Sequence, residues 1–106
     1  MSLRAEKVSG LVRELAAEFL AKESDRTSII TVTRANISSN LKEAKIYLSV
    51  YPQDSEKVAL KFAKRKRSEF RKYAQERMQI KKIPTFDFEI DMGEKNRQRI
   101  DKLLNK

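Results

Sequence analysis

The sequence predicts an α+β fold of four helices and three strands, in the order α-β-β-α-α-β-α. Four segments carry apolar residues at helical spacing, and three others alternate apolar and polar residues or are rich in β-branched ones. The chain has 106 residues, of which 40% are hydrophobic. It contains no internal repeat and no low-complexity linker. We therefore expect residues 1–106 to form a single domain.

The first predicted helix covers residues 3–22. Its apolar side chains recur three or four positions apart, from Val8 through Val12 and Leu15 to Phe19. This spacing places them on one face of a helix. A short polar segment, KESDRTS, then leads to the first strand.

The stretch IITVTRANI predicts a strand over residues 29–37, because it is rich in β-branched residues. Regular alternation along this strand would place Ile30 and Val32 on one face and Ile37 on the other, so the apolar residues would not share a face. One extra residue in the strand would bring all three to the same face. We therefore expect a β-bulge near Arg34.

The second strand follows a short turn, so the two strands should pair antiparallel. Alternation predicts that four apolar residues face inward: Ala44, Ile46, Leu48 and Val50. Tyr47 and Tyr51 then face outward. Such tyrosines either stack on nucleic-acid bases or cover a neighbouring strand, and the sequence leaves both readings open.

Residues 61–84 hold ten basic residues and two acidic ones, so this stretch accounts for +8 of the net charge of +9. In one straight helix, an apolar stripe from Val58 to Ala74 would have Lys66 at its centre. Burying an unpaired charge is costly. We therefore expect two helices with a break between Arg65 and Ser68, and Ser68 as the N-cap of the second. The alternative is an unbroken surface helix in which Lys66 snorkels to solvent.

The third predicted strand is TFDFEID, which begins after Pro84. Its apolar residues alternate with Asp87, Glu89 and Asp91. Acidic residues at every second position of a strand are typical of a solvent-exposed face, so we predict no metal site there. A final helix is expected over residues 94–104.

Composition excludes several classes of function. The chain has no cysteine and no histidine, which excludes disulfides, thiolate chemistry, catalysis that needs histidine, and most transition-metal sites. Its two glycines do not form a phosphate-binding loop. No apolar run is long enough for a membrane span or a signal peptide. We expect a cytoplasmic protein without cofactor or enzymatic activity.

The basic stretch predicts a surface that binds the phosphates of folded RNA. Such binding weakens steeply with salt, and about six phosphate contacts would cost roughly a thousandfold in affinity between 50 and 200 mM salt. The N-terminus of the second helix would add its dipole at the same place. The candidate RNA-binding residues are Lys64, Arg65, Lys66, Arg67, Ser68, Arg71, Lys72, Lys45, Arg77, Lys81 and Lys82.

Three long segments give the chain a family resemblance. They are RAEKVSGLVRELAAEFLAKE, VTRANISSNLKEAKIYLSVYP and RMQIKKIPTFDFEID. Together they resemble the ribosome-binding factor A family, and the most specific parts are residues 40–47 and the Ile83-Pro84 step. Where that family has an Ala-x-Gly kink between two helices, this chain has Lys66-Arg67-Ser68.

The resemblance implies a type II KH-like domain, in which helices cover one face of a three-stranded sheet. It also implies the partner, which is the immature small (30S) ribosomal subunit with its 16S ribosomal RNA. The expected action is to assist subunit maturation as a monomer and without catalysis, alongside other assembly factors such as a GTPase.

Two other functions fit the same charge pattern. The basic corner of Lys64, Arg65, Lys66 and Arg67, which should project into solvent, could dock an acidic protein, with RNA binding incidental. The helix pair around Ser68 also resembles a helix-turn-helix, which suggests a DNA-binding regulator, although a β-hairpin is foreign to the simplest forms of that motif.

Overall fold

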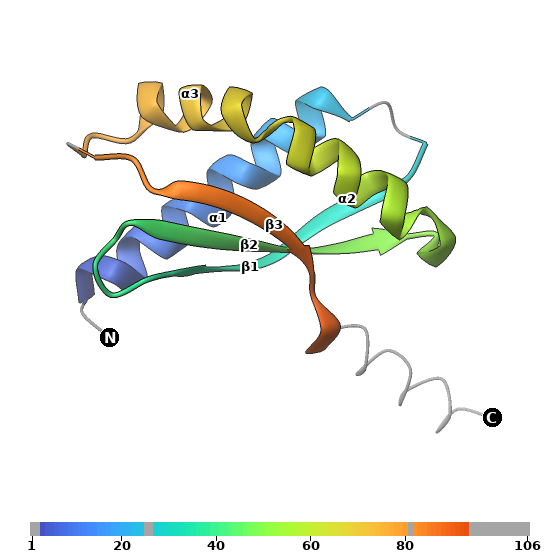
Figure 1. Cartoon of the computed structure of the whole chain (residues 1–106), viewed down its shortest axis with the longest axis horizontal. Helices are drawn as coiled ribbons and strands as arrows, with labels where there is room; N and C mark the ends of the chain where they lie inside the picture. The colour runs from blue at the N-terminus through green and yellow to red at the C-terminus, as the bar shows by residue number, and fades with distance from the viewer. Residues whose placement is uncertain (1–2, 25–26, 81, 94–106) are drawn as a thin grey trace.

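The computed structural model describes residues 3–24, 27–80 and 82–93 (Figure 1). The elements in order are α1 (Leu3–Glu23), β1 (Ile29–Ile37), β2 (Glu43–Tyr51), the 3-10 turn η1 (Gln53–Ser55), α2 (Glu56–Arg65), α3 (Arg67–Arg77) and β3 (Thr85–Ile90). This order matches the prediction as far as β3. The helix predicted over 94–104 lies outside the described residues.

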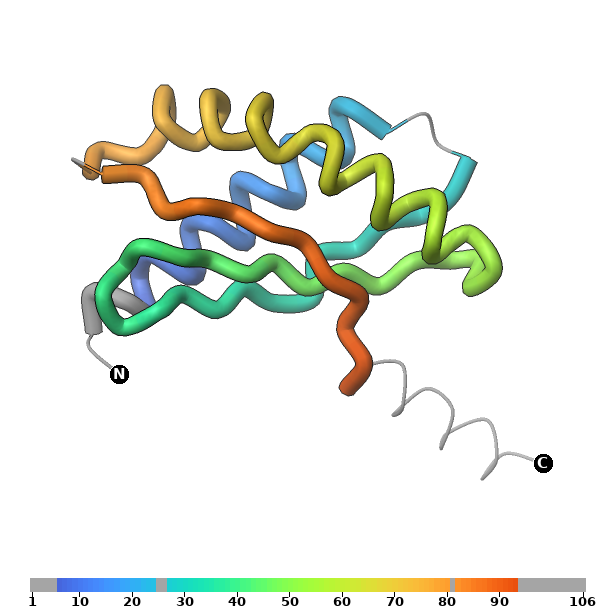
Figure 2. Tube along the Cα trace, in the orientation of Figure 1, coloured from blue at the N-terminus to red at the C-terminus, as the bar shows by residue number. Residues whose placement is uncertain are grey.

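The three strands form one mixed sheet with β2 in the centre. β1 pairs antiparallel with one edge of β2, and β3 pairs parallel with the other. A parallel neighbour needs a crossover connection, and the α2–α3 pair supplies it. Figure 2 shows this path, in which the chain leaves β2 at one end of the sheet and returns along the two helices.

The hydrophobic core lies between one face of the sheet and the helices. The inward residues predicted for β2 are all buried, and Phe86 and Phe88 of β3 lie opposite Ala44 and Ile46 in the parallel register. Buried residues of α1, α2 and α3 join the same hydrophobic cluster. The prediction of a KH-like α+β fold, with helices on one face of a three-stranded sheet, is confirmed.

Phe70 lies at the centre of this core and is fully buried. Its ring centroid is 4.7 Å from that of Phe86 and 5.4 Å from that of Phe19. One side chain of α3 therefore contacts both the first helix and the last strand. These contacts position α3 over the sheet, beside its edge strand β3.

The bulge predicted in β1 is present. Val32 pairs with Leu48 and Arg34 pairs with Tyr47, so Thr33 is the extra residue. Ile30 and Val32 before the bulge and Ile37 after it therefore lie on the same face of the sheet, although regular alternation would have separated them.

The break between the two helices falls at Lys66. Its φ and ψ are −91° and 6°. Its N–H donates to the carbonyls of Phe62 and Ala63 at 3.2 and 3.1 Å, and its carbonyl accepts from the N–H of Phe70 at 2.8 Å. The prediction of two helices is therefore confirmed, and the alternative of one unbroken helix is wrong.

Two details of that prediction are wrong. Ser68 lies inside α3, whose cap position is Lys66, and no side-chain cap bond is made there. Because the backbone of Lys66 is bonded on both sides of the break, α3 begins without a serine cap. Val58 is 70% exposed, since the buried face of α2 centres on Ala59 and Ala63.

Candidate nucleic-acid interface

The α2–α3 junction places four consecutive cations at the edge of the sheet. Lys64 and Arg65 end α2, Lys66 forms the break, and Arg67 begins α3. The sequence predicted that all four project into solvent as one basic corner. The structure instead divides them according to whether a carboxylate of the same chain lies within reach.

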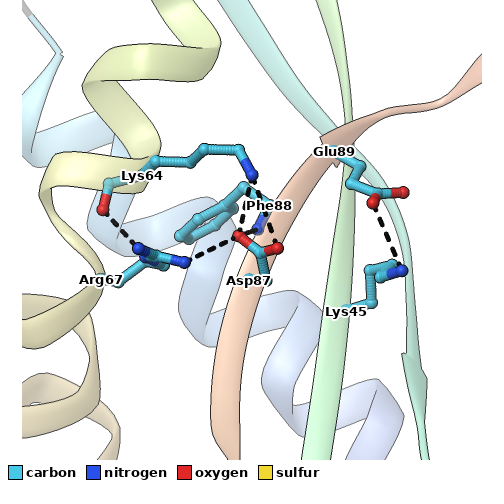
Figure 3. A network of polar contacts seen from close by, with 6 residues as sticks. All are labelled: Lys45, Lys64, Arg67, Asp87, Phe88 and Glu89. Atoms are coloured by element: carbon cyan, nitrogen blue, oxygen red, sulfur yellow. Dashed lines mark hydrogen bonds and ion pairs between the residues drawn. The ribbon is translucent and has the colours of Figure 1, made fainter.

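Lys64 and Arg67 both contact Asp87 of β3 (Figure 3). The Lys64 Nζ lies 3.2 Å from Asp87 Oδ1, and the Arg67 Nη1 lies 3.2 Å from the same oxygen. The Arg67 Nε also donates to the carbonyl of Lys64 at 3.1 Å, which fixes the guanidinium. We call Lys64, Arg67 and Asp87 the Asp87 clamp.

The clamp changes the titration of its carboxylate. Partial burial acts to raise the pKa of Asp87. The backbone N–H of Phe88, at 2.9 Å from Oδ1, and the charges of Lys64 and Arg67 outweigh that effect. The pKa of Asp87 is therefore lowered from its usual value of 3.8.

Lys66 is paired within its own helix turn. Its Nζ lies 3.3 Å from Glu69 Oε2, at i,i+3 spacing. Three of the four junction cations thus face carboxylates of the same chain. Arg65 alone of these four has no such partner in the described residues.

Exposed cations without such a partner lie along both helices, before and after the break at Lys66. We call these five residues the basic face: Lys57, Lys61, Arg65, Arg71 and Lys72. None of them makes an ion pair within residues 3–24, 27–80 and 82–93. In α2 these cations recur every four residues, so they lie on one side of the helix about 6 Å apart.

The sequence analysis did not single out Lys57 and Lys61, which lie exposed on α2 together with Arg65. Their spacing with Arg65, at i, i+4 and i+8, was the signal that could have found them. The predicted break drew attention to the junction, where pairing with Asp87 and Glu69 leaves less free charge than composition suggests.

The remaining predicted residues lie at separate places. Lys45, on β2, pairs with Glu89 of β3 at 3.3 Å, and the hydrogen bond to Glu89 raises the pKa of Lys45. Arg77 lies over the Tyr73 ring, with its Cζ 3.6 Å from the ring centroid. Lys82 is exposed between α3 and β3. Lys81 lies outside the described residues, and Ser68 is exposed on α3.

The two outward tyrosines have different surroundings. The guanidinium carbon of Arg34 lies 4.1 Å from the centroid of the Tyr47 ring, so one face of that ring is covered. Tyr51 is 72% exposed at the end of β2. Of these two rings, Tyr51 offers the larger free surface for stacking.

Asp91 is the one buried acidic residue of the described chain. Its Oδ2 accepts a hydrogen bond from the Thr33 hydroxyl at 2.6 Å and lies 3.4 Å from Arg34 Nε. The carboxylate thus ties the end of β3 to the bulge in β1, on the outer face of the sheet.

Metal-ligand clusters and membrane-spanning helices are both absent from the described residues. These residues contain no group of three or more acidic side chains placed to hold a metal ion. None of their helices has the length and apolar character needed to cross a membrane.

Comparison with known proteins identifies the family. The family model for ribosome-binding factor A matches residues 4–104. The chain is 32% identical over 103 residues to ribosome-binding factor A of Thermodesulfovibrio yellowstonii, an alignment that covers 95% of this chain and 87% of that protein. The chain belongs to the ribosome-binding factor A family. It spans about half the length of the Tropheryma whipplei member, with 26% identity and 54% of that protein covered.

Solved structures of the family share the fold. The crystal structure of ribosome-binding factor A from Thermus thermophilus matches with a TM-score of 0.73 and 16% identity, over 81% of this chain and 94% of that one. A homology model of the Thermus thermophilus factor, fitted into a cryo-EM map of a 30S complex, matches with a TM-score of 0.68 and 17% identity, over 76% of this chain and 88% of that one. Membership therefore has support from sequence and from fold.

Proposed function

We propose that this protein is a ribosome biogenesis factor that binds the immature small ribosomal subunit and its 16S ribosomal RNA. The whole chain acts as one KH-like RNA-binding domain. It works as a cytoplasmic monomer and assists maturation by binding, without catalysing a reaction. Family membership supports this proposal, as does the fitted 30S complex of a structural neighbour.

One observation of this chain carries the proposed mode of binding. The five cations of the basic face are exposed and have no carboxylate partner in the described part of the chain. Their spacing of about 6 Å along α2 is comparable to that of successive phosphates on a nucleic-acid strand. The basic face therefore makes the main phosphate contacts, and Arg65 links its α2 and α3 parts.

Phosphate contacts position a protein on RNA without reading sequence. Choice of site must come from the shape of the RNA or from unpaired bases. The exposed ring of Tyr51 is the aromatic surface on which such a base would stack.

Co-sedimentation with small ribosomal subunits tests the proposal. The variant Lys61→Gln/Arg65→Gln/Arg71→Gln removes three charges of the basic face and should weaken binding about tenfold or more. Its matched control is Lys7→Gln/Arg13→Gln/Lys42→Gln, which removes three exposed charges elsewhere. This control should bind nearly as well as the wild type.

Equal weakening in both variants would contradict the role of the basic face. Ribonuclease treatment separates RNA binding from a protein contact. Binding to RNA predicts that the complex is lost after digestion, whereas a complex that survives digestion would favour the docking of an acidic protein.

A further inference from the structure

The Asp87 clamp has the geometry of an anion site that is already filled. Asp87 Oδ1 accepts from three donors, which are the Lys64 Nζ and the Arg67 Nη1, both at 3.2 Å, and the Phe88 N–H at 2.9 Å. A lysine, an arginine and a backbone N–H around one anionic oxygen are the donors that proteins use for a phosphate. In this chain the anion is a side chain of the edge strand.

The clamp is open to solvent. The side chains of Lys64, Arg67 and Asp87 are 39%, 49% and 36% exposed. Arg67 and Asp87 also line a groove on the sheet, together with Glu43, Lys45 and Thr85. Figure 3 shows Asp87 between the helix junction on one side and the Lys45–Glu89 pair on the other. An anion from solvent can therefore reach both cations.

We propose that Lys64 and Arg67 form a second phosphate-binding site for RNA, and that the Asp87 carboxylate competes with the phosphodiester for it. This inference rests on the proposed function for the source of the phosphate. The basic face offers free charge to RNA, whereas the clamp accepts a phosphate only in exchange for its own carboxylate.

Opening the clamp costs little free energy. Exposed ion pairs contribute little to stability, because solvent screens them and long side chains lose freedom on pairing. The carboxylate therefore weakens a phosphate contact at Lys64 and Arg67 without abolishing it. RNA that covers both the helix pair and the sheet edge gains these two contacts, whereas RNA that does not reach Lys64 and Arg67 gains nothing from them.

The test compares two variants that each lose one negative charge. Asp87→Asn keeps the shape of the side chain and an acceptor for the Phe88 N–H, and it removes the competing charge. Glu14→Gln is the control, because Glu14 is exposed on α1 and forms no ion pair with a cation of the helix junction or of the groove. Affinity for purified bacterial small ribosomal subunits is measured over a range of salt concentrations.

Asp87→Asn should bind about two- to five-fold more tightly than Glu14→Gln at about 0.15 M salt. Its plot of log affinity against log salt should be steeper by about one unit, as one further counterion is released. If the two variants bind alike, Asp87 is only a structural tie and the inference is overturned. Asp87→Ser, which keeps a hydroxyl acceptor, takes its place if the Asn variant does not fold.

A double-mutant cycle locates the effect. In a Lys64→Gln/Arg67→Gln background, the gain from Asp87→Asn should disappear, since no cation is left for the phosphate. A gain that persists there would be a general effect of net charge and would also overturn the inference. The proposed function fails separately, if the wild-type protein does not bind small subunits at all.

Discussion

At the scale of single residues, Asp87 links the chemistry of the site to the stability of the fold. Its pKa is lowered in the folded protein, mainly because the Phe88 N–H, Lys64 and Arg67 outweigh the effect of burial. A lowered folded pKa means that the carboxylate stabilises the fold fully above its unfolded pKa, near 3.8, and that this contribution is lost as pH falls through the folded pKa.

We therefore expect the wild-type protein to lose more free energy of unfolding between about pH 5 and about pH 2.5 than Asp87→Asn does. Urea denaturation at the two pH values measures the difference. Asp54→Asn removes an exposed carboxylate of η1 and should follow the wild type. Identical pH dependence of Asp87→Asn and wild type would contradict the stabilising role of the clamp.

Packing at single positions gives a second prediction. Phe70 is fully buried among aromatic rings, so Phe70→Ala should lower the free energy of unfolding by about 3–5 kcal/mol. Val58→Ala should change it by less than about 0.5 kcal/mol, because Val58 is 70% exposed. Chemical denaturation of both variants measures these values, and a large loss at Val58 would show that α2 packs differently.

At the scale of elements, local patterns predicted most of the fold. The extent of β1 follows from its β-branched residues, and the position of its bulge follows from the alternation of apolar residues within the strand. The inward face of β2 follows from strict alternation. The start of α3 was harder to predict. A serine near a break suggested a cap, but the backbone of Lys66 continues from one helix into the next and leaves Ser68 without that role.

Two deletions in β1 test the bulge. Deleting Thr33 removes the extra residue and leaves Val32 and Arg34 opposite their present partners, so the register of β1 is kept. The cost should be about 1–3 kcal/mol, from the hydrogen bond to the buried carboxylate of Asp91.

Deleting Ala35 shortens β1 equally but moves Arg34 to the partly buried inward position of Ala35, opposite Ile46. Placing that charge against the core should cost more than the deletion of Thr33. Thermal and urea unfolding compare the two deletions. The bulge assignment fails if the Thr33 deletion is the more damaging.

At the scale of the whole molecule, the sequence located the excess of positive charge but not how it is distributed. Residues 61–84 hold most of it, as composition alone shows. Asp87 follows Arg67 by 20 positions and meets it only because β3 forms the edge of the sheet beside the helix junction. Tertiary contacts of this kind leave no local pattern in the sequence. The sequence therefore predicted free positive charge at the junction, whereas in the structure the unpaired cations are those of the basic face.

The salt dependence of binding to small ribosomal subunits tests the central claim most directly. Each phosphate contact contributes about 0.7–0.9 to the slope of log affinity against log salt concentration. Lys61→Gln/Arg65→Gln/Arg71→Gln should therefore lower the wild-type slope by about 2–3 units, and Lys7→Gln/Arg13→Gln/Lys42→Gln should leave it nearly unchanged. An unchanged slope in the first variant would contradict the assignment of the basic face as the RNA-binding surface.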